Sequence, residues 1–396
     1  MSRLFIIGAG VSHALADLPL GRELAYLIFQ KAQKTSPADQ AHYKLANGYK
    51  RVWRYLQDQV VPEVELLQKD GTQIETLDDG SHPLDLEYLL TLIDLNLNAP
   101  YIPKGIGVDL QGCPIPYLRE FNKFILEDAR NFILHQIYEI FKPPYSTDKS
   151  DLIGGLVQFI SRGDSIITFN YDLLLEQAMF TCGKWNPLDG YGIGGICADE
   201  TMLGDQPPSE IELIKLHGSI NWSEGSMIVL SPDLVIHVSS YENECFFQGM
   251  QVNSSHKPYH LRYPRNPIVV MPTYLKLYDK AIEVELVNKA LDKARTADEV
   301  YILGYSIPKA DVTANLIVSQ IRKDAKVVIV NRSEAEDLRE RFIKTYGFKS
   351  DRIIHEQSDI REWIKNDFQY RAYDHWKEGQ EFFESMKSVS VQPTHE

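Results

Sequence analysis

Cysteine is scarce in this chain, and its few cysteines are scattered. The 396 residues include 4 cysteines, at positions 113, 182, 197 and 245, and no two of them form a Cys-x-x-Cys pair. Structural zinc sites usually take their ligands from such pairs, so we expect no zinc. So few cysteines are typical of a reducing compartment, which predicts a cytoplasmic protein.

Long apolar runs and an excess of positive charge are lacking as well. No stretch approaches the length of about 18 apolar residues that spans a bilayer. The apolar run at residues 4–7 is too short for a signal peptide. Acidic residues outnumber basic ones by 55 to 41, which gives a net charge of −14. Proteins that hold nucleic acid by net charge are basic, so we expect neither direct nucleic-acid binding nor membrane contact.

A strand, a glycine turn and a helix follow one another at the start of the chain. The apolar run at 4–7 leads into Gly-Ala-Gly-Val-Ser at 8–12, and a helical spacing of apolar residues follows through Ile28. Glycines in this context allow a tight turn, and the N-terminus of the next helix offers unpaired N–H groups to a phosphate.

The same alternation of strand and helix returns in the second half of the chain. Further strands are predicted at 165–169, 212–216, 300–303 and 327–330, and helices at 173–181, 279–296, 310–323 and from 333. This order predicts an α/β fold with a doubly wound parallel sheet of the Rossmann type. Residues 226–271 alternate well enough for additional short strands.

A helical insertion interrupts this pattern. Apolar residues at helical spacing predict helices at 38–69, 84–97 and 117–141. We therefore expect residues 1–36 and 161–357 to form the α/β domain, 37–160 a helical insertion, and 358–396 C-terminal helices and a polar tail.

Polar motifs stand where the predicted strands end. Besides the glycine motif, they are Asn-Tyr-Asp at 170–172, His-Gly-Ser at 217–219, Gly-Tyr-Ser at 304–306, and Asn331. Each has a structural alternative: a tight turn for the glycines, a helix cap for Asp172 or Asn331, and a packed side chain for His217. Ligands bind outside the carboxyl ends of such strands, so the joint placement favours one ligand site.

These motifs, in this order, resemble those of the sirtuin fold across residues 4–331. The chain looks closer to the sirtuin-like NAD-hydrolysing proteins of bacterial antiphage defence. Leu18-Pro19 after the glycine motif and the run Lys-Leu-His-Gly-Ser-Ile-Asn-Trp at 215–222 are typical of that branch. Protein-deacylating sirtuins differ, because they carry two Cys-x-x-Cys pairs and a Pro-Asp-Phe-Arg stretch that this chain lacks.

The resemblance implies NAD as the substrate and cleavage of the bond between nicotinamide and ribose. Asn170 would hold the ribose or the attacking water, and Asp172 would accept from the nicotinamide amide. His217 would be the general base, since the ordinary pKa of a histidine, about 6.5, lets it take a proton at neutral pH.

The remaining motifs would bind the rest of the dinucleotide. Gly8, Ala9, Gly10 and Ser12 would cradle the diphosphate, Gly304 and Ser306 would approach the phosphates or the adenosine ribose, and Asn331 would bind that ribose. The glycine-rich loop at 183–195 is either a lid or a connector without a role.

Two other functions stay open: a protein deacylase or ADP-ribosyltransferase, and a non-catalytic sensor of NAD or ADP-ribose. The missing cysteine pairs weigh against the first, and the retained Asn170, Asp172 and His217 weigh against the second. A toxic NAD hydrolase must be restrained, so we expect a homo-oligomer. The resemblance alone suggests a HerA-type ring ATPase as a partner.

Overall fold

The computed structural model of the chain describes residues 2–67, 86–98, 123–142, 150–187, 189–192, 208–224, 236–238, 267–269, 281–308 and 311–368. The chain divides into two compact units. The sheet unit comprises Met1–Leu18, Phe141–Val270 and Tyr278–Glu396, and the helical unit comprises Pro19–Ile140 and Met271–Leu277.

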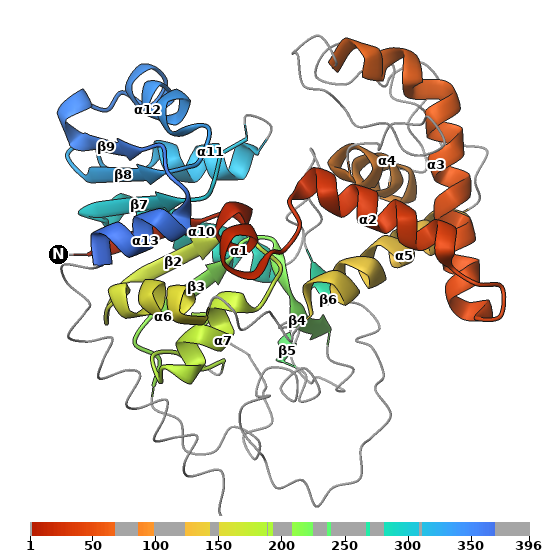
Figure 1. Ribbon diagram of the computed structural model, residues 1–396, viewed down its shortest axis with the longest axis horizontal. Helices are drawn as coiled ribbons and strands as arrows, with labels where there is room; N and C mark the ends of the chain where they lie inside the picture. Colours follow the sequence, from red (N-terminus) through yellow and green to blue (C-terminus); the bar gives the residue numbers. More distant parts are fainter. Residues whose placement is uncertain are drawn as a thin grey trace, which may run out of the picture. The chain divides into compact units, whose positions relative to one another are not determined.

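A six-stranded parallel sheet forms the centre of the sheet unit, with the strand order β3-β2-β1-β7-β8-β9 (Figure 1). Its strands are β1 (Arg3–Ile7), β2 (Ser165–Thr168), β3 (Glu212–Lys215), β7 (Glu299–Leu303), β8 (Lys326–Val330) and β9 (Ile353–Glu356). The order runs outward in both directions from the pair β1 and β7, as in the Rossmann arrangement. The predicted α/β fold with a doubly wound parallel sheet is therefore confirmed.

The central strands are buried on both faces, and this explains their unbroken apolar runs. In β1, Phe5 pairs with Ile166 of β2 on one side and with Tyr301 of β7 on the other. These three residues are buried, as is Ile302, which follows Tyr301 in β7. Phe5, Ile166 and Ile302 are 0% exposed, and Tyr301 is 8% exposed. Parallel strands covered by helices on both faces have this composition instead of an apolar and polar alternation.

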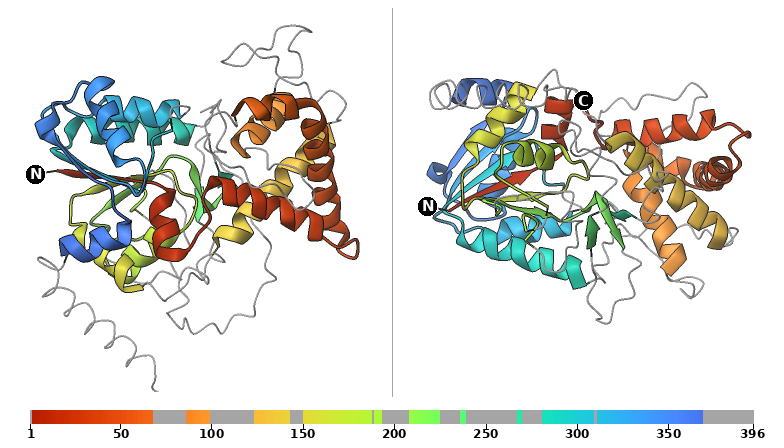
Figure 2. Two further views of the ribbon diagram at one scale, coloured as in Figure 1. Left: turned by 45° about the horizontal axis from the view of Figure 1, so that its top comes forward. Right: turned by 90° about the horizontal axis from the view of Figure 1, so that it is seen from below.

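Helices cover both faces of the sheet (Figure 2). One layer contains α1 (Ala9–Ala16), α6 (Ser150–Phe159), α7 (Leu174–Thr181) and α13 (Ile360–Phe368), which contact one another. The other layer contains α10 (Ala281–Thr296), α11 (Val312–Ser319) and α12 (Ala335–Lys344), and a short 3-10 helix at Ser350–Arg352 precedes β9. Two helical layers around one sheet are what a doubly wound topology produces.

A small antiparallel sheet follows β3. It has the order β5-β4-β6, with β4 at Gly218–Glu224, β5 at Ile236–Val238 and β6 at Pro267–Val269. Gly218 has a φ of 71°, a backbone conformation that suits glycine and lets the chain leave the parallel sheet sharply. The short strands expected within 226–271 are represented by β5 and β6, and the rest of that range lies outside the described residues.

The helical unit contains α2 (Gly21–Lys34), α3 (Gln40–Leu67), α4 (Leu86–Asn98) and α5 (Lys123–Phe141). Its core includes aromatic contacts between Tyr49 and Phe132, 5.3 Å apart, and between Phe29 and Trp53, 4.8 Å apart. Each predicted helix of the insertion therefore has a counterpart. No helix within the described ranges is both long and apolar enough to cross a membrane.

The observed division of the chain differs from the expected boundaries in several places. The helical unit extends to Ile140 and not to residue 160, because α6 packs on α7 and α13 within the sheet unit, and it also includes Met271–Leu277. The first boundary falls after Leu18 and not after residue 36, because α2 packs on α3 and α4. The segment α13 belongs to the sheet unit, because it packs on α6 and α1 and buries Trp363 against Phe159 at 5.9 Å. The polar tail from 369 onward lies outside the described residues.

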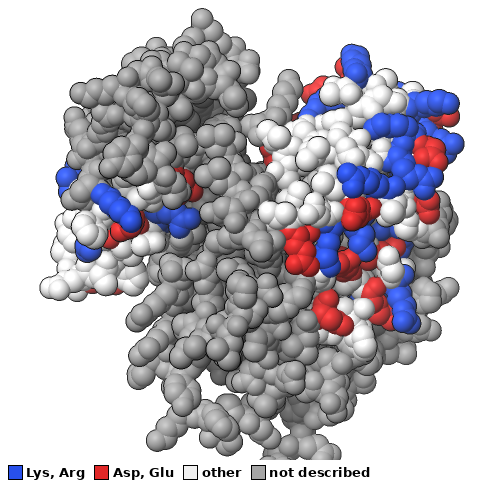
Figure 3. Space-filling model, turned by 180° about the vertical axis from the view of Figure 1, so that it is seen from behind, with Lys and Arg blue, Asp and Glu red and all other residues white. Residues whose placement is uncertain are grey.

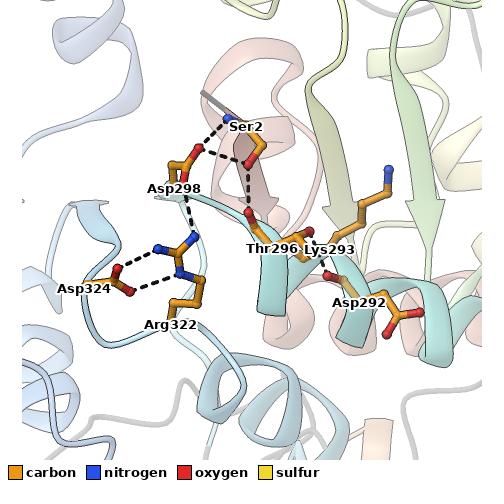
Figure 4. A network of polar contacts seen from close by, with 7 residues as sticks. All are labelled: Ser2, Asp292, Lys293, Thr296, Asp298, Arg322 and Asp324. Atoms are coloured by element: carbon orange, nitrogen blue, oxygen red, sulfur yellow. Dashed lines mark hydrogen bonds and ion pairs between the residues drawn. The ribbon is translucent and has the colours of Figure 1, made fainter.

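A polar network joins the amino end of β1 to the start of β7 (Figure 4). The backbone N–H of Ser2 donates to Asp298 at 2.9 Å, and Arg322 bridges Asp298 at 3.2 Å and Asp324 at 2.5 Å. The Ser2 N–H, followed by the Arg322 guanidinium, holds the pKa of the Asp298 carboxyl below its usual value. These groups are exposed, so their contribution to stability is small.

Charges of both signs are mixed on the face of the molecule seen in Figure 3. On this face, lysine and arginine side chains lie interspersed with aspartate and glutamate (Figure 3). Pairs such as Arg295–Asp292 on α10 and Lys344–Glu340 on α12 arise from helical spacing. Such pairs of opposite charge, three or four residues apart, stabilise their own helix slightly.

Candidate active site at the carboxyl edge of the sheet

The register of the parallel sheet brings the predicted polar motifs to one edge. Ile7 at the end of β1 pairs with Thr168 of β2 and with Leu303 of β7. Thr168 pairs with Lys215 of β3, and Leu303 pairs with Val330 of β8. The segments that follow these five strand ends carry all of the predicted site residues, and all of them belong to the sheet unit.

The glycine motif after β1 lies against the loop after β7. The N–H of Gly8 donates to the Leu303 carbonyl, and the N–H of Gly10 donates to the Gly304 carbonyl, both at 3.0 Å. A Cβ atom at Gly10 would lie 2.7 Å from the Gly304 oxygen, and Gly304 itself has a φ of 56°. Close approach of two backbones therefore explains these glycines.

This packing changes what the predicted diphosphate cradle can offer. The amides of Gly8 and Gly10 are already donated within the protein, so they differ from the open N–H groups that we expected. Ala9 is exposed at the first position of α1, where an N–H has no partner within the helix. The Ser12 hydroxyl is buried and accepts a hydrogen bond from Asn170 at 2.9 Å.

Asn170 ties the end of β2 to the glycine motif. Its Nδ2 group donates to the Gly8 carbonyl at 3.2 Å and to the Ser12 hydroxyl at 2.9 Å. Its backbone N–H donates to Thr168 Oγ1 at 3.1 Å, and that hydroxyl donates to the Ile7 carbonyl at 3.0 Å. Both side-chain hydrogens are thus used within the protein. Among the described residues no donor reaches Asn170 Oδ1, so this oxygen is the atom that can serve a ligand.

Asp172 stands on the loop between β2 and α7, where it is 4% exposed. Its Oδ1 accepts from the backbone N–H of Leu174 at 3.0 Å, which satisfies an amide at the start of α7. The N-cap of α7 is Leu173, so Asp172 accepts from the first helical amide without being the N-cap residue itself. Because the carboxylate has a second oxygen with further lone pairs, this bond leaves Asp172 able to accept from a ligand amide.

A fully buried ion pair lies behind this loop. Lys215 Nζ donates to the Asp172 carbonyl and to Glu176 Oε1, both at 2.6 Å, and the two charged side chains are 0% and 2% exposed. Burial raises the pKa of Glu176, and Lys215 opposes that rise. Tyr191 donates to the same carboxylate at 3.4 Å. Lys215 thus joins β3 to the loop that carries Asn170 and Asp172.

His217 occupies the turn between β3 and β4, where its imidazole is enclosed by aromatic rings. Phe169 meets it edge-on at a centroid distance of 5.1 Å, and Tyr171 lies nearly parallel to it at 6.0 Å. Its Nε2 lies 3.8 Å from the Oδ2 of Asp311. The two residues on either side of Asn170 therefore contact the imidazole, so His217 lies against the segment that carries Asn170.

The loop after β7 and the end of β8 complete the edge. Arg341 donates to the carbonyls of Ser306 at 3.2 Å and Ile307 at 2.8 Å, and so holds a loop in which Ile307 has a φ of 49°. The Ser306 hydroxyl bonds to none of the described residues. Asn331 Oδ1 accepts from the N–H groups of Ser333 and Glu334 in the turn that precedes α12, whose N-cap is Glu334, and its Nδ2 remains a donor.

Sequence reasoning missed several residues at this edge. Thr168, Glu176 and Asp311 have no motif of their own, because their partners come from other strands or loops. Lys215 gave a usable signal: a lysine within the apolar run Leu-Ile-Lys-Leu of a central strand must be buried with a partner.

Metal binding finds no support in the part of the chain that the structure describes. No group of three or more His, Cys, Asp or Glu side chains there is arranged to hold a metal ion. Cys182 is a free thiol, and positions 113, 197 and 245 lie outside the described residues. Only the first part of the loop at 183–195 is described, with Gly192 at a φ of 65°.

Comparison with known proteins adds a family likeness. Residues 164–350 match the model of the SIR2-like domain. The matched range holds Asn170, Asp172, His217, Ser306 and Asn331, and it supports a sirtuin-like fold for this part of the chain. No curated protein matches the sequence.

Several solved structures are remotely similar. The structure from "Structural Basis for the Mechanism and Regulation of Sir2 Enzymes" has a TM-score of 0.37 and 14% identity, over 92% of this chain and 89% of that chain. A histidine-to-asparagine mutant of a Sir2 homologue in complex with ADP ribose has a TM-score of 0.37 and 11% identity, over 99% and 95%. Sir2Tm bound to a propionylated peptide has a TM-score of 0.34 and 14% identity, over 62% and 81%.

Proposed function

We propose that this chain hydrolyses NAD at the bond between nicotinamide and ribose. The observation that carries the proposal is the placement of His217 against Phe169 and Tyr171, the two neighbours of Asn170. A base and an oriented amide oxygen thus share the edge of the sheet where Rossmann-type folds bind dinucleotides. The SIR2-like match over 164–350 supports NAD as the substrate.

The proposed reaction needs few catalytic groups. The glycosidic C–N bond breaks, and its electron pair passes to the ring nitrogen, so nicotinamide leaves as a neutral molecule without a general acid. Water forms the new C–O bond at the sugar carbon, which has oxocarbenium character in the transition state. The proton of that water passes to the imidazole of His217, directly or through a ribose hydroxyl.

The other residues hold the substrate in the geometry that this reaction requires. Asn170 Oδ1 accepts from the attacking water or a ribose hydroxyl, since its Nδ2 hydrogens are used within the protein. The second oxygen of Asp172 accepts from the nicotinamide amide. The amide of Ala9 and the hydroxyl of Ser306 serve the phosphates, and Asn331 Nδ2 serves the adenosine ribose. Positioning of this kind lowers the barrier by converting binding energy into orientation.

Product analysis tests the proposal and separates it from its alternatives. The purified protein is incubated with NAD alone, with NAD and an acetylated peptide, and with NAD and a protein acceptor. Equal amounts of nicotinamide and free ADP-ribose from NAD alone support hydrolysis. Nicotinamide release that requires the peptide or labels the acceptor supports a deacylase or a transferase. NAD binding without any product supports a sensor.

Asn170→Ala should reduce nicotinamide release by about 100-fold or more, because the oriented oxygen is lost and the glycine motif loses its link to β2. Initial rates at saturating NAD measure this. Asn96→Ala, which removes an amide from the helical unit, is the control and should keep the wild-type rate. A normal rate in folded Asn170→Ala would show that this residue only braces the loops.

The motifs resemble those of antiphage proteins, and on this ground the proposal includes a role in antiphage defence. Depletion of NAD would stop an infected cell, and a partner such as a HerA-type ATPase would restrain or trigger the activity. Such control predicts that turnover follows assembly. Light scattering over a concentration series, combined with NAD turnover per chain, measures both. A strictly monomeric protein with full activity and no dependence on a partner would contradict this part of the proposal.

A further inference from the structure

The two carboxylate oxygens of Asp311 have different partners. It is the N-cap residue of α11, and its Oδ1 accepts from the backbone N–H of Ala314 at 3.0 Å. Its Oδ2 accepts from the Tyr305 hydroxyl at 3.0 Å and lies 3.8 Å from Nε2 of His217. One oxygen therefore serves the helix, and the other faces the imidazole.

Capping alone does not account for a charge at this position. Asp311 is 8% exposed and His217 is 7% exposed, and an ionised carboxylate is costly at such depth unless it has compensating partners. Asparagine caps helices about as well as aspartate without carrying a charge. The charge matters when His217 becomes protonated, because a carboxylate 3.8 Å away stabilises the imidazolium.

We propose that Asp311 is a positioning residue for the general base: its carboxylate, held by Tyr305, orients the His217 imidazole and stabilises the imidazolium that forms when water is deprotonated. This inference rests on the proposed NAD hydrolysis for its catalytic meaning. The interaction of the two side chains does not depend on which reaction the site performs.

Asp311 is a carboxylate close to the imidazole, with its Oδ2 atom 3.8 Å from His217 Nε2. The titratable and charged groups on the described segments around His217 are Tyr171, Asp172, the Lys215–Glu176 pair, Tyr305, Asp311, and Arg341 on α12. Lys215 and Glu176 compensate each other at 2.6 Å, and Arg341 donates to backbone carbonyls. The tyrosines are neutral at pH 7. Removing the charge of Asp311 is therefore the change that should act on His217 most directly.

The test is Asp311→Asn, which keeps an N-cap side chain and removes the charge. We expect the pKa of His217 to fall by about one unit, because an opposite charge at this distance favours the protonated form. The acid limb of the rate profile should move to lower pH by the same amount, and the plateau rate should fall by about three- to tenfold since the base is weaker. Asp298→Asn, which removes an equal charge from the exposed network in Figure 4, is the control and should change neither quantity. Thermal unfolding confirms that each variant is folded.

The pKa of His217 is read by NMR of the histidine Cε1–H signals, assigned by their loss in His217→Ala. If the wild type releases nicotinamide and Asp311→Asn shows an unshifted profile, the inference is overturned and the proposed function stands. If the wild type releases none, the proposed function fails, and the NMR shift alone decides the inference. Should Asp311→Asn fail to fold, the wild type still decides it. A His217 pKa at or above about 6.5 in this buried position supports the carboxylate, and a clearly lower one contradicts it.

Discussion

His217→Ala should abolish NAD cleavage while the protein remains folded. We expect the rate of nicotinamide release to fall by about 10²–10⁴, the usual cost of removing a general base. The side chain contacts Phe169 and Tyr171 at a turn and not in the centre of the sheet, so truncation should leave the strands in place. Initial rates, together with circular dichroism, measure both effects.

A second histidine provides the control for this variant. His355 lies on the edge strand β9, where it is exposed and pairs with Glu336 at 2.6 Å. His355→Ala should keep the wild-type rate. Turnover at the wild-type level in folded His217→Ala would remove the base from the mechanism and leave His217 as a packed residue.

Lys215→Ala should have the largest effect on stability. The variant leaves the Glu176 carboxylate buried without its partner, and breaking a buried pair in this way costs about 3–5 kcal/mol in the free energy of unfolding. Chemical denaturation at pH 7 measures the loss. Activity should fall as well, because Lys215 also holds the carbonyl of Asp172.

The pH dependence of this loss has a definite sign. Burial raises the pKa of Glu176 above its ordinary value of 4.5, and removing Lys215 removes the interaction that opposes the rise. A carboxyl with a raised pKa in the folded state is tolerated below its unfolded pKa and destabilises as pH rises through the folded value. The deficit of Lys215→Ala should therefore grow from about pH 4.5 upward.

Two further variants isolate the pair as the cause. Lys344→Ala removes an exposed lysine that contacts Glu340 at 2.7 Å, and should change the free energy of unfolding far less than Lys215→Ala does. The double variant Lys215→Met with Glu176→Leu replaces both charges by apolar side chains and should recover much of the loss. A deficit in Lys215→Ala as small as that in Lys344→Ala would contradict the buried ion pair.

The sheet was predictable because its strands are buried on both faces. Apolar runs such as 4–7, 300–303 and 327–330 were sufficient to predict these strands. Each of the three strands begins one residue earlier than predicted. The edge strand β9 escaped prediction, because its residues Ile354 and His355 are exposed and its apolar run is only two residues long. A strand with one open edge needs less apolar sequence.

The location of the site was predictable, whereas the state of its hydrogen-bonding groups was not. The carboxyl ends of neighbouring strands lie at one edge in any parallel sheet. Motifs that follow those strands were therefore predictably close to one another. The amides of Gly8 and Gly10 donate to a loop almost three hundred residues away in sequence, at Leu303 and Gly304. The hydrogens of Asn170 are likewise used by Gly8 and Ser12. No local pattern encodes such pairings, because they depend on how two loops approach each other in the fold.

The central claim is that His217, at the same sheet edge as Asn170, removes a proton from water during hydrolysis of NAD. Its most direct test is the quantity of nicotinamide and ADP-ribose released from NAD by wild-type protein and by His217→Ala, in every assembly state that the concentration series yields. We predict equal amounts of both products from the wild type in at least one assembly state, and at least about a 100-fold lower rate from His217→Ala in that same state. Binding of NAD with no release of nicotinamide in any state, or equal release by both proteins, would contradict the claim.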